Sequence, residues 1–130
     1  MAQTPIRVGI NGFGRIGRNF FRAVNAANAP IEIVAVNDLG SIKTMAHLLK
    51  YDSVLGILPN EIVPVEDGIS VDGKVLKVLQ FRDPKDLPWK SLGVDVVIES
   101  TGFFTDRDKA AAHLDAGAPL VIVSAPSTGA

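Results

Sequence analysis

Residues 7–22 read RVGINGFGRIGRNFFR and contain the pattern that decides the fold. An apolar run, Val8-Gly9-Ile10, is followed by Gly12, Gly14 and Gly17, and a helical pattern begins after them. This order of strand, glycine turn and helix is what the pyrophosphate of a dinucleotide requires. Gly12 permits the tight turn, Gly14 lets the backbone approach the phosphates, and Gly17 lets the helix pack closely on the strand. The phosphates would then lie at the helix N-terminus.

A G-x-G-x-x-G pattern also occurs in ordinary surface turns, so its surroundings matter. A second apolar run, residues 31–36, follows the helical pattern and ends at Asn37 and Asp38. Asp38 comes roughly 20 residues after Gly17, the separation expected of an acid that binds the ribose hydroxyls of a dinucleotide. The order of strand, glycines, helix, strand and acid therefore predicts a dinucleotide-binding site.

The composition limits the class of protein. With 130 residues, 47% of them hydrophobic, the chain suits one domain. The formal net charge of −1 predicts no general attraction to nucleic acid. No apolar run approaches the length of a membrane span and no basic, apolar leader opens the chain, which predicts a cytoplasmic protein without a membrane segment. Cysteine is absent and the two histidines stand apart, so we expect no disulfide and no metal site.

The helical segments are predicted from apolar spacing and capping residues. The first helix is expected over residues 15–27, with Arg18 and Arg22 on a polar face. Ser41 is a candidate N-cap for a second, short helix. A third helix would start at Asp106 or Asp108 and end at the C-capping Gly117. The stripe of the first helix expected to cover the sheet consists of Ile16, Phe20, Ala23 and Ala27.

The strand pattern predicts how the sheet is built. Residues 62–78 form short β-branched segments, and Asp72-Gly73 joins the last two as a two-residue hairpin turn. Residues 94–98 and 120–123 are near-continuous apolar runs, as expected of parallel strands covered on both faces. We therefore predict an α/β fold, a doubly wound parallel Rossmann-type sheet with a small antiparallel hairpin insert.

Loops after the predicted parallel strands carry further candidate residues. The carboxyl ends of these strands meet at the edge where open α/β sheets bind ligands. Each candidate also has a plain structural interpretation, because Ser100 and Ser124 could cap turns and Arg82 could be a solvated charge. The candidates beyond the glycine loop are Asp38, Arg82, Ser100, Thr101, Gly102, Phe103 and Ser124.

No catalytic residue is predicted. The sequence has no nucleophile with a neighbouring base, and no spacing of Ser, His and Asp suggests a triad. Tyr51 is the only tyrosine, and Leu55 stands four residues after it, so the Tyr-x-x-x-Lys arrangement of short-chain dehydrogenases is absent.

Five longer motifs are NGFGRIGR at residues 11–18, VNDLG at 36–40, HLLKYDS at 47–53, ESTGFF at 99–104 and SAPS at 124–127. Together they resemble the phosphorylating glyceraldehyde-3-phosphate dehydrogenases. The first and fourth motifs are far more specific than the glycine pattern alone, and the resemblance covers essentially the whole chain. It implies the cofactor-binding half of a homotetrameric glycolytic enzyme.

The resemblance implies a role for each matching position. Arg15 and Ile16 would lie at the pyrophosphate, and Asp38 would hold the adenosine ribose. Arg82 would lie near the adenine. Residues 101–103 would follow the adenosine side, and Ser124 would lie near the nicotinamide.

The cofactor implied by this resemblance is NAD. Leu39, beside Asp38, resembles the NAD-preferring members, because a 2′-phosphate would meet a carboxylate and an apolar side chain. The predicted cofactor-binding residues are Asn11, Gly12, Gly14, Arg15, Ile16, Gly17, Asp38, Leu39, Arg82, Ser100, Thr101, Gly102, Phe103 and Ser124.

Departures from the family pattern limit the predicted activity. The nucleophilic cysteine, the catalytic histidine, the phosphate-binding residues and the terminal helix of the family are not found in this sequence. We therefore predict that residues 1–130 are an NAD-binding domain that is catalytically silent alone. An exposed apolar face or unpaired sheet edge would favour self-association into a homo-oligomer. The alternatives are an assembly or scaffold module with a vestigial nucleotide site, and a small reductase with His113 as its acid.

Overall fold

A single seven-stranded sheet runs through the part of the chain that the computed structural model describes, residues 6–27, 30–52, 56–81, 86–100 and 112–123. The strand order is β5-β6-β7-β2-β1-β8-β9. The parallel strands are β7 (Lys74–Leu79), β2 (Ile31–Asn37), β1 (Ile6–Asn11), β8 (Val96–Glu99) and β9 (Leu120–Val123). The antiparallel strands are β5 (Ile62–Val65) and β6 (Gly68–Val71).

Strand β1 marks the point where the order of the sheet reverses. It pairs in parallel with β2 on one side and with β8 on the other. From β1 the chain passes to β2, crosses to the far edge at β5 and returns inward through β6 to β7. It later enters β8 on the other side of β1 and moves outward to β9. In open α/β sheets a ligand binds outside the carboxyl ends of the strands at such a reversal. The predicted doubly wound sheet is confirmed, and its reversal point directs attention to the loops after β1 and β8.

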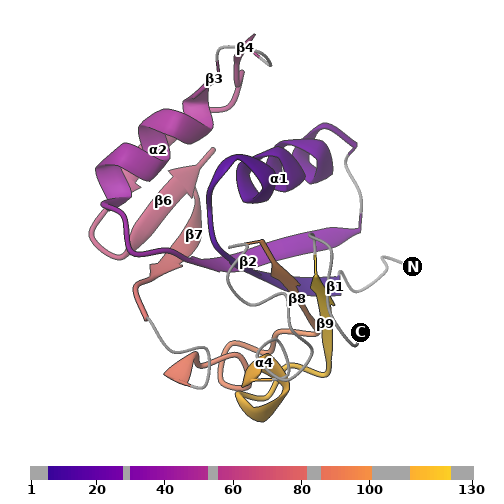
Figure 1. The fold of residues 1–130 in the computed structure, drawn as a ribbon. Helices are drawn as coiled ribbons and strands as arrows, with labels where there is room; N and C mark the ends of the chain where they lie inside the picture. Colours follow the sequence, from indigo (N-terminus) through magenta and orange to yellow (C-terminus); the bar gives the residue numbers. More distant parts are fainter. Residues whose placement is uncertain (1–5, 28–29, 53–55, 82–85, 101–111, 124–130) are drawn as a thin grey trace.

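Helices cover both faces of the sheet. The helices α1 (Arg15–Ala27) and α2 (Ile42–Lys50) lie on one face, and α4 (Ala112–Asp115) lies on the other (Figure 1). The α1 face has a core around Val8, Ile10, Phe21 and Val36. The opposite core includes the fully buried Trp89, whose ring occupies the space where a Cβ on Gly9 would lie. Gly9 therefore lets an aromatic ring pack against the backbone of β1.

The predicted hairpin is confirmed. Its turn residues Asp72 and Gly73 have φ values of 52° and 85°, the left-handed pair that a two-residue turn of type I′ requires. Because β7 pairs in parallel with β2, the hairpin extends the main sheet. A separate two-stranded sheet joins β3 (Tyr51–Asp52) to β4 (Gly56–Ile57).

Helix bounds agree well with the sequence pattern. The helix α1 spans the predicted residues, and Ser41 caps α2 by accepting a hydrogen bond from the Thr44 N–H at 3.1 Å. The third predicted helix appears as α4 and ends where predicted, since the Gly117 N–H donates to the Leu114 carbonyl at 3.0 Å. Its predicted start at Asp106 or Asp108 lies outside the described residues.

The predicted apolar stripe of α1 is wrong in most of its members. Ile16 is 51% exposed, and Ala23 and Ala27 are also exposed. The helix instead buries Gly17 and Phe21, with Phe20 packed at the edge of the core. Alanine adds little apolar area, so a stripe that contains two alanines does not determine which face is buried.

Arg22 was predicted on a polar face but is buried at 9% exposure. Its guanidinium donates to the carbonyl oxygens of Leu49, Lys50 and Gly56 at 2.8–3.2 Å. The bonds to Leu49 and Lys50 engage C-terminal carbonyls of α2, which the helix itself leaves unpaired, and the bond to Gly56 reaches β4. The helix α1 thus packs against the segment around α2 and β4 as well as against the sheet.

Candidate cofactor site

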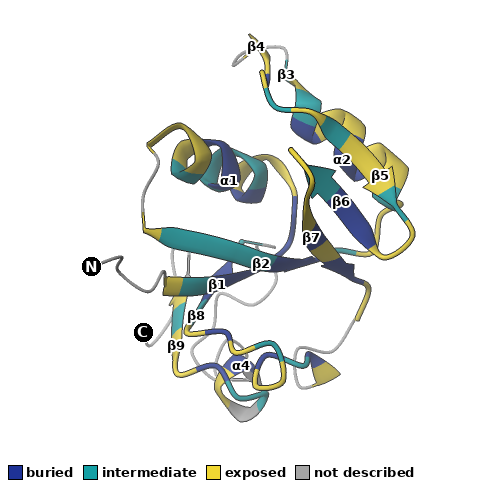
Figure 2. Ribbon diagram, turned by 180° about the vertical axis from the view of Figure 1, so that it is seen from behind, coloured by how far each residue is buried: buried dark blue, intermediate teal, exposed yellow. Residues whose placement is uncertain are grey.

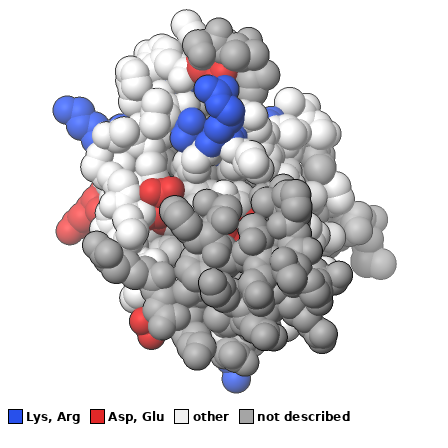
Figure 3. All heavy atoms as spheres, in the orientation of Figure 1, with Lys and Arg blue, Asp and Glu red and all other residues white. Residues whose placement is uncertain are grey.

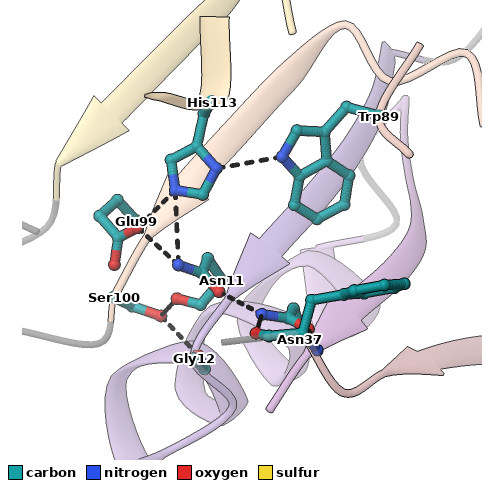
Figure 4. A network of polar contacts seen from close by, with 8 residues as sticks. Asn11, Gly12, Asn37, Trp89, Glu99, Ser100 and His113 are labelled. Carbon is teal, nitrogen blue, oxygen red and sulfur yellow. Dashed lines mark hydrogen bonds and ion pairs between the residues drawn. The ribbon is translucent and has the colours of Figure 1, made fainter. Parts of the chain in front are cut away.

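The glycine loop between β1 and α1 is held from both neighbouring strands. Gly12 has a φ of 91°, and its N–H donates to the Asn37 carbonyl at 2.7 Å. From the other side, the Ser100 hydroxyl donates to the carbonyl oxygens of Gly12 at 2.6 Å and Asn11 at 3.1 Å (Figure 4). A Cβ on Gly17 would collide with the Gly12 carbonyl oxygen. The roles predicted for Gly12 and Gly17 in turning and close packing are confirmed.

The outer side of this loop is open. Among the described residues, no atom lies within 4 Å of a Cβ placed on Gly14, and Gly14, Arg15 and Ile16 are all exposed. The first N–H groups of α1 have no acceptor within the helix, and the positive end of the helix dipole lies there. No acidic side chain occupies the first turn of α1. The loop therefore fits a negatively charged phosphate group.

Asp38 lies directly beside the glycine loop. Its Oδ2 accepts the Phe13 N–H at 2.9 Å, and its Oδ1 accepts the Gly40 N–H at 2.9 Å. The side chain is half-buried, while Leu39 next to it is 55% exposed. A carboxylate oxygen can accept more than one hydrogen bond, so Asp38 retains acceptor capacity for ribose hydroxyls. Phe13 and Asp38, which lie far apart in the sequence, thus form one corner of the site.

Arg15, Arg18 and Arg22 lie near the carboxylates of Asp38 and Asp52 around the start of α1. Burial lowers the pKa of Arg18, the neighbouring Arg15 lowers it further, and Asp52 and Asp38 oppose the shift. Arginine stays protonated at neutral pH despite such a shift. Arg15 approaches Asp52 at 4.0 Å. In the space-filling view, one compact group of basic side chains has acidic side chains above and below it, and further basic side chains lie apart from it (Figure 3).

A buried polar network lies beneath the loop, and the sequence did not predict it. The Trp89 Nε1–H donates to His113 Nδ1 at 3.0 Å, and His113 Nε2 lies 2.6 Å from Glu99 Oε2. Asn11 Nδ2 donates to the same Glu99 oxygen at 2.8 Å (Figure 4). Since His113 is fully buried with both ring nitrogens engaged, neither nitrogen is available to a substrate. The reductase alternative that used His113 as an acid therefore has no support.

The structure brings most of the predicted site residues to one edge. The described members are Asn11, Gly12, Gly14, Arg15, Ile16, Gly17, Asp38, Leu39 and Ser100. The members that lie outside the described residues are Arg82, Thr101, Gly102, Phe103 and Ser124.

A cavity of about 220 Å³ lies elsewhere, between α1, the start of β2 and the β6–β7 hairpin. Its polar side chains pair with one another, Lys74 with Glu32 and Asn60 with Asp72. None of its lining residues belongs to the glycine loop after β1 or to the first turn of a helix, so we do not assign the cofactor to it.

Two other kinds of site are absent from the described ranges. No group of three or more metal-ligating side chains occurs there. No helix there is long and apolar enough to cross a membrane.

The chain matches the family model described as "Glyceraldehyde 3-phosphate dehydrogenase, NAD binding domain" over residues 6–107. The chain belongs to this family. The predicted family and its cofactor, NAD, are thus confirmed.

Relatives named glyceraldehyde-3-phosphate dehydrogenase align along nearly the whole chain. The Streptomyces coelicolor protein is 62% identical over 122 residues, which are 94% of this chain and 36% of the relative. Glyceraldehyde-3-phosphate dehydrogenase 1 of Streptomyces arenae is 59% identical over 124 residues, 95% of this chain and 37% of the relative. The chloroplastic glyceraldehyde-3-phosphate dehydrogenase A of Nicotiana tabacum is 50% identical over 131 residues, which cover 99% of this chain and 33% of the relative. The chain spans about a third of the length of these relatives.

Proposed function

We propose that this chain binds NAD across the carboxyl ends of β2, β1 and β8, as the cofactor-binding domain of a glyceraldehyde-3-phosphate dehydrogenase-like oxidoreductase. The observation that carries the proposal is the 2.9 Å hydrogen bond from the Phe13 N–H to Asp38 Oδ2. It joins the acid suited to the ribose to the loop suited to the pyrophosphate, so one dinucleotide can reach both. When bound, NAD supplies a hydride acceptor, and the residues of this edge bind and orient it.

The same corner favours NAD over NADP. A 2′-phosphate would bring negative charge close to the Asp38 carboxylate, whose position is fixed by two backbone N–H groups. The exposed Leu39 offers that phosphate no hydrogen bond. Like charges at short range disfavour binding, so we expect the selectivity to depend on the charge of Asp38.

The proposal does not give these residues the acyl-transfer chemistry of the family. The 130 residues contain no cysteine, so no thiol nucleophile comes from them. We treat residues 1–130 as one NAD-binding domain whose role in catalysis would be to hold the cofactor.

Replacing Asp38 tests the proposed site. We expect Asp38→Ala to weaken NAD binding by about 1–3 kcal/mol, because a charged hydrogen-bonding partner is lost. We expect Asp38→Asn to keep an oxygen for the Phe13 N–H but to discriminate less against NADP, because the charge is gone. Isothermal titration of both variants with NAD and NADP measures these changes. Unchanged NAD affinity in Asp38→Ala would remove Asp38 from the ribose site.

We also propose that the chain self-associates through the β9 edge. Leu120 and Ile122 on this strand are 53% and 49% exposed, and β9 pairs only with β8 among the described strands. The opposite edge strand, β5, contains Pro64, which lacks an N–H group to offer to another strand. Sedimentation velocity over a range of concentrations should show a dimer or larger species. A monomer at every concentration would contradict this assignment.

A further inference from the structure

We infer that Trp89, His113 and Glu99 are positioning residues for the cofactor site, holding the ends of the parallel strands in register although they do not line the open edge. This inference rests on the proposed function, because it concerns how the same edge binds NAD. All three side chains are at most 1% exposed. They act through Asn11 and Asn37, which are also buried.

The direction of every hydrogen bond in the network follows from Trp89. The indole N–H can only donate, so His113 Nδ1 must accept and carry no proton. The ring proton of neutral His113 then lies on Nε2, where it donates to Glu99 Oε2 at 2.6 Å. A protonated Nδ1 would place two donors against each other. Trp89 thus selects one histidine tautomer.

Glu99 transmits this orientation to Asn11. Because Glu99 Oε2 accepts the His113 proton, it can only accept from Asn11 as well, so Asn11 must turn its Nδ2 toward Glu99 Oε2 and its Oδ1 away. That Oδ1 accepts from Asn37 Nδ2 at 2.8 Å. Low polarity of the surroundings strengthens these buried hydrogen bonds. The carboxamide of Asn11 therefore has a single favourable orientation.

Asn37 extends the network to the segment that follows β7. Its Nδ2 donates to the Phe81 carbonyl and its Oδ1 accepts the Phe81 N–H, both at 2.8 Å. This pair of bonds holds the backbone after β7 against the end of β2. The network therefore joins the carboxyl ends of β8, β1 and β2 and the segment after β7, as Figure 4 shows for its central part.

Each network residue at a strand end directly precedes a candidate cofactor residue. Asn11 precedes Gly12, Asn37 precedes Asp38, and Glu99 precedes Ser100. A side chain fixed at one position restrains the backbone of the next, and a dinucleotide needs its phosphate loop and its ribose acid at a set separation. The buried network is thus placed to fix that separation.

The variant that tests this role is Trp89→Phe, which removes the indole N–H and keeps an aromatic ring at the same position of the core. His113 can then take either tautomer, so the donor and acceptor roles within the network are no longer fixed. We expect NAD binding to weaken about threefold to tenfold, the loss typical of one hydrogen bond. In ¹⁵N NMR spectra, His113 should show a protonated Nε2 in the parent chain and a tautomer mixture in the variant.

A matched control separates positioning from general stability. Ile69 is fully buried in the other core, so Ile69→Val should lower stability by a similar amount and leave NAD affinity unchanged. If Trp89→Phe does not fold, Asn37→Ser breaks the network at another point and should also weaken NAD binding.

Three outcomes distinguish the positioning role of the network from the proposed binding of NAD. Weaker NAD binding in the folded network variant, with normal binding in Ile69→Val, supports the positioning role. Equal NAD affinity in parent and network variant overturns the positioning role alone. A parent chain that shows no saturable NAD binding overturns the proposed function and this inference with it.

Discussion

The two ends of the parallel strands differ in how far their polar side chains are buried. At the amino ends of β1, β2 and β7, Arg7 and Lys74 pair with Glu32 at 3.3 and 3.2 Å, with side-chain exposures of 41%, 71% and 23%. At the carboxyl ends, Asn11, Asn37 and Glu99 are at most 5% exposed and bond to one another. Burial increases along β1 and β2 in the same direction (Figure 2).

This difference shows where the fold depends on particular partners. An exposed ion pair contributes little, because water replaces whatever is lost. A buried polar group costs free energy unless its hydrogen bonds are made. The carboxyl ends, where sheets of this class bind ligands, are therefore also the ends at which a single side-chain change should have large consequences.

The largest effect is expected from Glu99→Leu. The change leaves the His113 Nε2–H and the Asn11 Nδ2–H without their shared acceptor in a fully buried setting. We expect the free energy of unfolding to fall by roughly 3–5 kcal/mol. Urea denaturation followed by circular dichroism measures this change. A loss below about 1 kcal/mol would mean that the network contributes no more than a surface contact.

The same substitution at the opposite end, Glu32→Leu, provides the smallest expected effect. Glu32 has two basic partners, but both are well exposed and can be solvated when the carboxylate is removed. We expect the free energy of unfolding to change by less than about 1 kcal/mol. The same denaturation experiment applies, with added salt, which should reduce the difference further. A fall in the free energy of unfolding equal to that of Glu99→Leu would mean that the amino and carboxyl ends of the strands do not differ in this respect.

The sequence was sufficient to predict the sheet and its glycine loop. Apolar runs, glycine spacing and the Asp72-Gly73 turn are local signals, and the corresponding elements appear in the structure. The spacing of the sequence also predicted that Asp38 lies beside the loop. In the structure, the hydrogen bond from the Phe13 N–H to Asp38 Oδ2 joins the two.

The buried network was not predicted, because its members come from distant segments. Trp89, Glu99 and His113 meet Asn11 only after the order of the strands is known. A usable signal was nevertheless present. Asn11, Asn37 and Glu99 each end an apolar run, and polar residues repeated at that position indicate a shared layer beneath the edge.

The burial of Arg22 was missed for a different reason. Helical periodicity identifies a polar face but not whether a second element covers it. Here the C-terminal carbonyls of α2 lie on that face and accept from the guanidinium.

An NMR titration of the ¹⁵N-labelled chain with NAD shows whether the cofactor binds at the carboxyl ends of the parallel strands. We expect saturable shift changes in the backbone amides of residues 12–17 and 38–40 and of Ser100. We expect none at Arg7, Glu32 or Lys74. No saturable change, or changes concentrated at the amino ends of the strands, would contradict the assignment of this edge as the NAD site.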